Sequence, residues 1–535
     1  MAGGTAGEAR AVHEGILRRQ SARESAARTY ARALPIVPVR ARGLTIEGAD
    51  GRRYLDCLSG AGTLALGHNH PVVLEAIRKV LDSGAPLSVL DLATPVKDAF
   101  TTELFRTLPP GLADRARVQF CGPAGTDAVE AALKLVRAAT GRSGILAFTG
   151  AYHGMTAGAL AASGGAPDVQ VARLPYPQDY RCPFGVGGAP GAELAARLTE
   201  SLLDDPKSGV PVAAGMILEP VQGEGGVVPA PDDWLRRMRR LTADRSIPLI
   251  ADEIQTGVGR TGAFWAVGHS GITPDVMVLS KAIGGSLPLA LIVYRDDMDV
   301  WQPGAHAGTF RGNQLAMAAG TATLAYVREN GLADRAATLG HHMLSQLVSL
   351  ADEFPCLGDV RGRGLMLGLE LVDPETEGAA SDTGCGHGSA YGNGSAYGNG
   401  SAYGNRPAPA SGHGPAHGHG PAYGLGPASG DHLAAPTGWK PTRVPRPAAP
   451  ELAAAVQREC LKRGLIVELG GRHASVVRLL PPLTISDEQA TAVLDRLADA
   501  LAAAARLHPT QSPARPHPAQ GPHHPRGDGP AQRAG

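Results

Sequence analysis

The chain has 535 residues with 50 basic and 50 acidic side chains, so no net field favours binding to nucleic acid or an anionic membrane. Its six cysteines lie far apart without a CxxC pair, which indicates free thiols in a reducing compartment and argues against a disulfide or zinc framework. It contains no apolar run long enough to span a membrane and no secretory signal. We therefore expect a soluble cytoplasmic protein without a metal site.

From about residue 35 to 373, apolar runs alternate with amphipathic stretches. Helical patterns occupy 126–140 and 232–245, and the second opens with paired aspartates, as helix N-termini favour. The alternation predicts an α/β domain with a mainly parallel sheet, whose ligand sites lie at the carboxyl ends of the strands. Six runs are predicted to be buried strands: "RVQFCG" (117–122), "GILAFTG" (144–150), "AGMILEP" (214–220), "IPLIADE" (247–253), "DVMVLSK" (275–281) and "LALIVY" (289–294).

Residues 374–448 break this pattern, because "GSAYGN" occurs three times between 388 and 405 and aliphatic residues are almost absent. Such a segment cannot bury enough surface to offset its chain entropy, so we predict a disordered insert. A repeat expansion in a tolerant surface loop is favoured over a weak metal site, since each doubling of loop length costs only about 0.6 kcal/mol. The histidines that the weaker alternative would use are His387, His413, His417, His419 and His432.

Regular structure is expected again after the insert. The stretches 449–469, 476–485 and 487–507 predict a helix, short strands and a final helix, which together form a smaller domain. The tail from 508 to 535 is rich in Pro, His and Gly and is predicted to be disordered.

Lys281 lies in "LSKAIGGSLP", where an apolar strand ends in glycines. The chain has only seven lysines against 43 arginines, and a buried lysine, unlike an arginine, can lose its proton near neutral pH. Asp252, in "IPLIADEIQTG", ends another apolar strand, and a carboxylate there is costly to bury alone. If both strands deliver their side chains to one crevice, the pair suits a pyridoxal cofactor, which needs an amine for its aldehyde and an acid for its ring nitrogen.

A phosphate site is predicted at "CGPAGTDAVEAALK", where a strand leads through a Gly-rich turn into a helix whose free N–H groups favour an anion. Alone, this signal is weak, because many folds cap helices in this way. The motif "GVGRTG" does not suit a dinucleotide, since no appropriate helix follows it.

Five motifs, "LIADEIQTGVGRTG", "VLSKAIGGSLPLA", "AGTFRGNQLAMAAG", "GMILEPVQGEGGV" and "VVRLLPPLTI", together resemble the class III pyridoxal-phosphate-dependent aminotransferases of fold type I. The resemblance runs from about residue 24 to 505 apart from the insert. It implies a large domain with a mainly parallel seven-stranded sheet and a smaller α+β domain. The implied divisions are an N-terminal segment packing on the small domain (1–60), a large cofactor-binding domain (61–335) and a small domain (336–373 and 449–507).

The same resemblance implies roles for individual residues. Lys281 would form the Schiff base with pyridoxal 5'-phosphate, and Asp252 would pair with the pyridine nitrogen. Thr309 would reach the phosphate held by a neighbouring subunit, which makes a homodimer necessary. The other implied cofactor contacts are Gly125 and Thr126 at the phosphate, Tyr152 stacked on the ring, His153 beside it and Gln255 near the ring hydroxyl.

Arg478, at the end of an apolar strand, would bind a substrate carboxylate as a planar fork. Glu224 resembles the family glutamate that pairs with this arginine when the substrate presents an amine at its far end. A purely structural ion pair is the alternative for both residues.

Finer features, "LSGAGTLALGHNHP", "DLATPVKDAF", "YHGMT" and "FRGNQLA", resemble the L-2,4-diaminobutyrate:2-oxoglutarate aminotransferases of siderophore and other secondary-metabolite pathways. Met155 stands where ornithine- and acetylornithine-type members usually have an arginine for a distal carboxylate, which disfavours those activities. The resemblance implies amino transfer from L-glutamate to L-aspartate 4-semialdehyde. The alternatives are an ornithine, acetylornithine or 4-aminobutyrate aminotransferase, or an aminomutase on the same fold.

Overall fold

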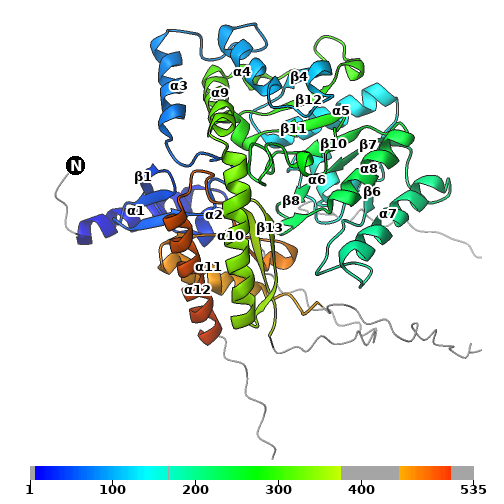
Figure 1. Ribbon diagram of the computed structural model, residues 1–535. Helices are drawn as coiled ribbons and strands as arrows, with labels where there is room; N and C mark the ends of the chain where they lie inside the picture. Colours follow the sequence, from blue (N-terminus) through cyan, green and yellow to red (C-terminus); the bar gives the residue numbers. More distant parts are fainter. Residues whose placement is uncertain (1–5, 167, 375–444, 508–535) are drawn as a thin grey trace, which may run out of the picture.

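The computed structural model describes residues 6–166, 168–374 and 445–507, and Figure 1 shows a large α/β layer joined to a smaller group of helices and strands. The predicted insert falls outside the described residues except for 374 and 445–448, and the predicted tail falls outside them completely. The two described ends of the insert lie together. The amide of Asp373 donates to the carbonyl of Pro447 at 3.0 Å, and Val372 bridges to Ala448.

A seven-stranded sheet forms the centre of the large domain. Its strands are parallel except for β12, which pairs antiparallel with both neighbours. The predicted mainly parallel seven-stranded sheet is confirmed, and all six predicted strands are present. The strand order is β4 (Ala116–Phe120), β12 (Leu291–Arg295), β11 (Val276–Leu279), β10 (Leu249–Asp252), β7 (Ala213–Leu218), β5 (Gly144–Phe148) and β6 (Val171–Leu174).

Helices cover both faces of this sheet. Successive side chains on a strand point to opposite faces, so each strand packs against helices on both sides. On β5, Ile145 and Ala147 pack with helices α5 (Gly125–Thr140) and α6 (Ala157–Ser163). Leu146 and Phe148 face the other way, toward α7 (Gly188–Asp204) and α8 (Asp232–Asp244). This two-sided burial explains why the central strands read as continuous apolar runs.

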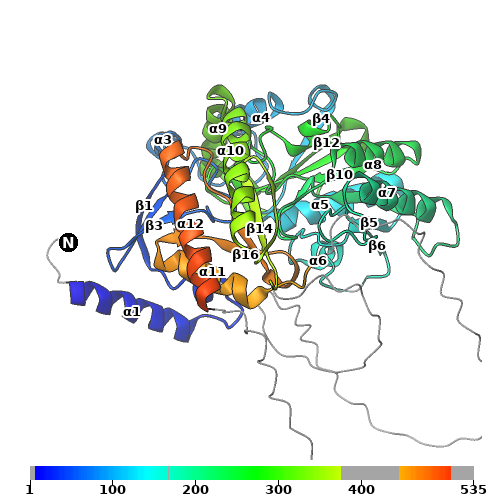
Figure 2. The same ribbon diagram turned by 60° about the horizontal axis from the view of Figure 1, so that its bottom comes forward.

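The small domain is built on an antiparallel sheet of four strands, in the order β13 (Leu357–Arg363), β14 (Met366–Leu371), β17 (Val476–Leu479) and β16 (Glu468–Gly470). Helix α10 (Leu332–Glu353) packs on β13, as Figure 1 shows, and α11 (Pro450–Lys462) packs on α12 (Asp487–Leu507), as Figure 2 shows. Opposite Arg478 in the register lie Gly368 on β14 and Glu468 on β16.

The N-terminal segment joins the small domain through a second sheet of four strands, in which β15 (Leu465–Ile466) pairs in parallel with β3 (Arg53–Asp56). The other strands are β1 (Pro38–Arg42) and β2 (Thr45–Gly48), and helices α1 (Ala6–Arg23) and α2 (Tyr30–Ala33) precede them. This arrangement brings α2 to the edge of the site described below.

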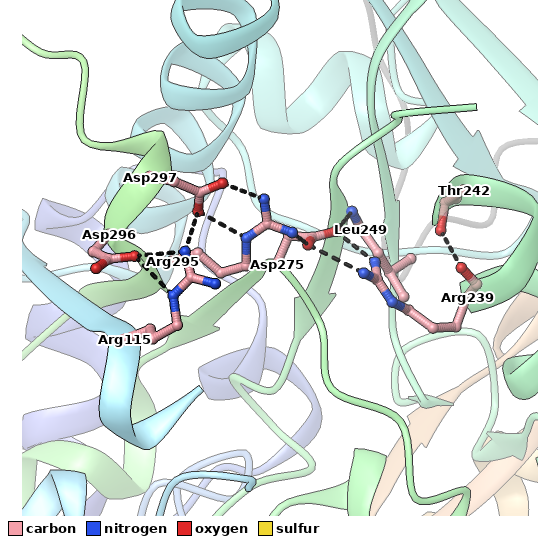
Figure 3. Close-up of polar contacts among 8 residues, drawn as sticks. All are labelled: Arg115, Arg239, Thr242, Leu249, Asp275, Arg295, Asp296 and Asp297. Atoms are coloured by element: carbon pink, nitrogen blue, oxygen red, sulfur yellow. Dashed lines mark hydrogen bonds and ion pairs between the residues drawn. The ribbon is translucent and has the colours of Figure 1, made fainter. Parts of the chain in front are cut away.

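Three further helices, α3 (Pro71–Asp82), α4 (Pro95–Phe105) and α9 (Gln314–Glu329), pack on one another beside the large sheet. At the amino end of β11, buried Asp275 accepts hydrogen bonds from Arg239, Arg295 and the amide of Leu249, as Figure 3 shows. Within the described part of the chain, no helix has the length and apolar character needed to cross a membrane.

Candidate active site

A cavity of about 260 Å³ opens at the carboxyl edge of the large sheet. Asp252 ends β10 and pairs in register with Val278 of β11, so Lys281, three residues further on, emerges at the same edge. Eight of the ten predicted site residues line this cavity: Gly125, Thr126, Tyr152, His153, Glu224, Asp252, Gln255 and Lys281. Depressions of about 680 and 640 Å³ beside α3 and between α10 and α12 have no lysine in their lining.

Lys281 opens the 3-10 turn Lys281–Gly284 with a backbone φ of +50°, a left-handed conformation that strains a residue with a side chain. Burial lowers the pKa of its amine, although Glu224 and Glu468 oppose the shift. The fold thus holds a buried amine with a lowered pKa at the edge of the sheet.

Asp252 is paired with His153, whose Nδ1 lies 2.7 Å from the carboxylate Oδ2. Both side chains are buried. Burial alone would lower the pKa of His153, but the hydrogen bond and charge of Asp252 together raise it. The hydrogen-bond partner of buried Asp252 is therefore the histidine predicted beside the cofactor.

Glu219 also lines the cavity, and sequence reasoning did not select it. Its carboxylate accepts from the amide of Tyr152 at 2.9 Å and from the amide of Gly223 at 3.0 Å. Burial raises the pKa of Glu219 to about 7. The position of Glu219 directly after the apolar strand β7 was an available signal, similar to that of Asp252 at the end of β10.

The predicted phosphate-binding site lies at the N-terminus of the 16-residue helix α5. A Cβ at Gly125 would come within 2.9 Å of Ile254, and one at Gly154 would press on the Thr126 side chain, so both backbones approach their neighbours closely. The Thr126 hydroxyl shares a 2.5 Å hydrogen bond with Thr156. Free helix N–H groups, a hydroxyl and small residues are the donor set that suits a phosphate.

The remaining cavity wall fits a flat heteroaromatic ring. Tyr152 is 42% exposed and faces the cavity. Gln255 donates to the carbonyl of Ala61 at 3.0 Å, whereas its Oε1 and the Nε2 of His153 are buried without a hydrogen-bond partner in the described structure. Buried polar atoms without partners are rare in folded proteins, so these two are consistent with a polar ligand beside Asp252.

Arg478 lies behind Glu224, and its guanidinium is fully buried. Its Nη2 donates to Glu224 Oε1 at 2.8 Å and lies 2.9 Å from Glu468 Oε2. The loop that carries Glu224 is tied down as well, since the amide of Gly471 donates to the Glu224 carbonyl at 2.7 Å. The two predicted substrate residues are therefore in contact.

Thr309 is exposed and is not among the residues that line the cavity of its own chain. It belongs to the 3-10 turn Thr309–Gly312, and the neighbouring Phe310 is 68% exposed.

Besides Glu219, sequence reasoning missed Glu468 and Tyr30. The hydroxyl of Tyr30 donates to Glu468 Oε1 at 2.7 Å. These two residues are 438 positions apart, so no local pattern could have joined them.

A parallel sheet that brings a buried lysine, a histidine-paired acid and a helix N-terminus to one cavity defines a vitamin-B6-dependent enzyme of fold type I. Comparison with known proteins narrows this class. The family model for class III aminotransferases matches residues 26–391. The chain belongs to the class III aminotransferase family, whose cofactor is pyridoxal 5'-phosphate (PLP).

Individual relatives agree with this assignment. A protein of Rhizobium meliloti (strain 1021) named diaminobutyrate--2-oxoglutarate aminotransferase is 49% identical over 93% of this chain and 93% of its own length. A protein of the same name from Haemophilus influenzae is 42% identical, covering 91% and 94%. Among solved structures, an amine transaminase from an uncultivated Pseudomonas species in its PLP-bound form matches with a TM-score of 0.69 at 26% identity, covering 90% of this chain and 98% of the other.

Proposed function

We propose that the chain transfers an amino group from L-glutamate to L-aspartate 4-semialdehyde, giving 2-oxoglutarate and L-2,4-diaminobutyrate. The observation that carries this proposal is the Glu224–Arg478 pair next to Lys281, because one cavity must accept first a donor with an α-carboxylate and then an acceptor with an ammonium group at its far end. The names of the two relatives support diaminobutyrate over other diamines.

In this proposal Lys281 would hold PLP covalently, Asp252 would pair with its ring nitrogen, and Gly125 and Thr126 would bind its phosphate. Tyr152 would cover one face of the ring. The other cofactor contacts would be His153, which orients Asp252, and Gln255, which also lines the cavity.

Bound PLP supplies an electron sink for the carbon that carries the amino group. The hydrogen bond between His153 and Asp252 would orient the Asp252 carboxylate toward the ring nitrogen, where an acid favours the protonated ring. The Lys281 amine would move the proton that leaves the donor α-carbon, and burial, which lowers its pKa, favours the neutral amine that this role needs.

Arg478 would receive the α-carboxylate of glutamate once Glu224 turns away from it. When the amino acceptor enters, Glu224 would return to Arg478 and screen the guanidinium from an approaching ammonium. Met155 is 66% exposed at the cavity and cannot bind a carboxylate, which disfavours ornithine and acetylornithine as substrates.

A homodimer completes the proposal, with Thr309 of each subunit contributing to the phosphate site of the other. The turn that carries Thr309 lies against the segment 83–94, because Ser88 bridges to Asn313. The exposed side chains of this region form an apolar patch of a kind that marks interfaces: Leu87, Leu90, Leu92 and Phe310. The described cysteines are free thiols, which supports a cytoplasmic location.

The test is a spectrum of the purified PLP-loaded protein during single half-reactions. L-glutamate should remove the visible absorption of the bound cofactor, and L-aspartate 4-semialdehyde should restore it, with ping-pong steady-state kinetics. Faster restoration by L-glutamate 5-semialdehyde or succinic semialdehyde would assign the chain to the ornithine or 4-aminobutyrate type instead. Turnover without any keto acid would indicate an aminomutase.

A further inference from the structure

Two carboxylates converge on a single nitrogen of Arg478. Glu224 Oε1 accepts a hydrogen bond from Nη2 at 2.8 Å, and Glu468 Oε2 lies 2.9 Å from the same nitrogen as an ion pair without hydrogen-bond geometry. The Nε and Nη1 of Arg478 have no acceptor among the described residues, although the guanidinium is fully buried. This is an unusual use of an arginine, whose fork normally binds one carboxylate through two nitrogens.

Glu468 is fixed from both sides. It lies on β16 directly opposite Arg478 on β17, and only 3% of its side chain is exposed. Its other oxygen accepts the hydroxyl of Tyr30, which α2 carries in from the N-terminal segment, at 2.7 Å. A flexible carboxylate on the surface would interact only weakly with a nearby charge, because solvent screens it. A buried carboxylate that is held in one orientation interacts more strongly.

The charges do not balance. Two carboxylates face one guanidinium, so the group carries one excess negative charge whenever both acids are ionised. Burial raises the pKa of Glu468, with Glu224 adding to the rise and Arg478 opposing it. The same three residues all act on the pKa of Lys281, which places their charges within reach of the reacting amine. A buried excess charge of this kind is costly unless a cation neutralises it.

We infer that Glu468 is a specificity-determining residue that selects amino substrates with a second ammonium group at the end remote from the reacting amine. This inference rests on the proposed function, in which L-2,4-diaminobutyrate reacts at its γ-amine and presents its α-ammonium to Glu224 and Glu468. A substrate such as 4-aminobutyrate presents only a carboxylate there and meets the excess negative charge. L-glutamate reacts at its α-amine and places its α-carboxylate on Arg478, which Glu468 already partly neutralises.

The test compares Glu468→Gln with wild type in half-reactions of the PLP-loaded protein, using L-2,4-diaminobutyrate, L-glutamate and 4-aminobutyrate. The kcat/KM for diaminobutyrate should fall at least tenfold, while the values for glutamate and 4-aminobutyrate stay the same or rise. Glu103→Gln is the matched control, because Glu103 is also buried and paired with two arginines but lies on α4, away from the cavity lining. It should leave the ratio of diaminobutyrate to glutamate unchanged.

An equal fall with all three substrates would show that Glu468 only supports the fold and would overturn the inference. If Glu468→Gln does not accumulate as folded protein, Tyr30→Phe decides, since it removes the hydrogen bond to Glu468 and keeps the charge. A fall in the ratio of diaminobutyrate to glutamate then supports the inference, and an unchanged ratio overturns it.

The wild-type values separate this inference from the proposed function. If wild type uses ornithine in preference to diaminobutyrate, the proposed substrate is wrong, and the same comparison on ornithine still tests Glu468, because ornithine also carries a distal ammonium. If wild type uses 4-aminobutyrate best, both proposals fail. If wild type uses diaminobutyrate and Glu468→Gln leaves the ratio intact, the inference alone fails.

Discussion

Glu253 follows Asp252 in the chain but turns away from the cavity, and replacing it with glutamine should change how stability depends on pH. The side chain is buried at 2% exposure. One oxygen accepts the hydroxyl of Thr256 at 2.5 Å and the other accepts the amide of Val267 at 2.8 Å. Glutamine matches this shape, and its amide can donate to the Thr256 oxygen while its carbonyl accepts from Val267.

Burial raises the pKa of Glu253 from 4.5 to about 7. Between these two values the native protein keeps a proton that the unfolded chain has lost, so the stability contributed by this group is complete below about pH 4.5 and is lost as pH rises through 7. A shift of about 2.5 units corresponds to about 3 kcal/mol. Glu253→Gln carries no titrating proton, so it should match wild type below about pH 4.5 and exceed it by an amount that grows from about 1 kcal/mol at pH 5 to about 3 kcal/mol at pH 8.

The assay is thermal unfolding of the PLP-saturated wild type and variant at pH 5, 6, 7 and 8. The melting temperature of Glu253→Gln should rise relative to wild type across this series. Glu103→Gln breaks ion pairs to Arg106 and Arg328 and should lower the melting temperature at pH 7 and 8. A constant difference between Glu253→Gln and wild type at all four pH values would refute the assigned titration of Glu253.

Three further outcomes are expected. Asp275→Asn should lower the free energy of unfolding by about 3 kcal/mol, because buried Asp275 accepts hydrogen bonds from two arginines and a backbone amide (Figure 3). Asp297→Asn should lower it by less than about 1 kcal/mol, because the Asp297 side chain is 45% exposed. Urea unfolding of both variants measures the two free energies. Gly340→Ala should lower the melting temperature despite the higher helix propensity of alanine, since the added Cβ would meet the backbone of Gly364. Lys281→Ala should reduce kcat by roughly 10²–10⁴-fold and remove the covalent cofactor absorption, and retained turnover would refute its assigned role.

The sequence predicted the large sheet well because its central strands are buried on both faces and therefore read as apolar runs. The strand β6 escaped prediction for the opposite reason. It lies at the edge of the sheet, is four residues long, and only Leu174 among its side chains is buried. A short edge strand with half-exposed side chains gives neither a continuous apolar run nor a clear alternation.

The residues of the candidate site likewise fall into those that the sequence could predict and those that it could not. Residues that follow apolar strands, such as Asp252 and Lys281, are visible because a charge at the end of a buried strand is conspicuous in the sequence. Glu468 and Tyr30 are not, since their meeting depends on the register of β16 against β17 and on the path of the N-terminal segment. A contact between residues far apart in the chain, which only the tertiary fold brings together, leaves no periodic pattern in the sequence around either residue.

Glu219 shows how such a contact can couple two loops that lie far apart in the sequence. Its carboxylate accepts from the amide of Tyr152, which lines the cavity, and from the amide of Gly223, which precedes Glu224. A change in the charge of Glu219 near pH 7 therefore acts on both loops at once, because the carboxyl group becomes a weaker acceptor for the two amides when it is protonated. The loops that carry Tyr152 and Gly223 should accordingly respond together to pH, through one buried acid that lines the cavity.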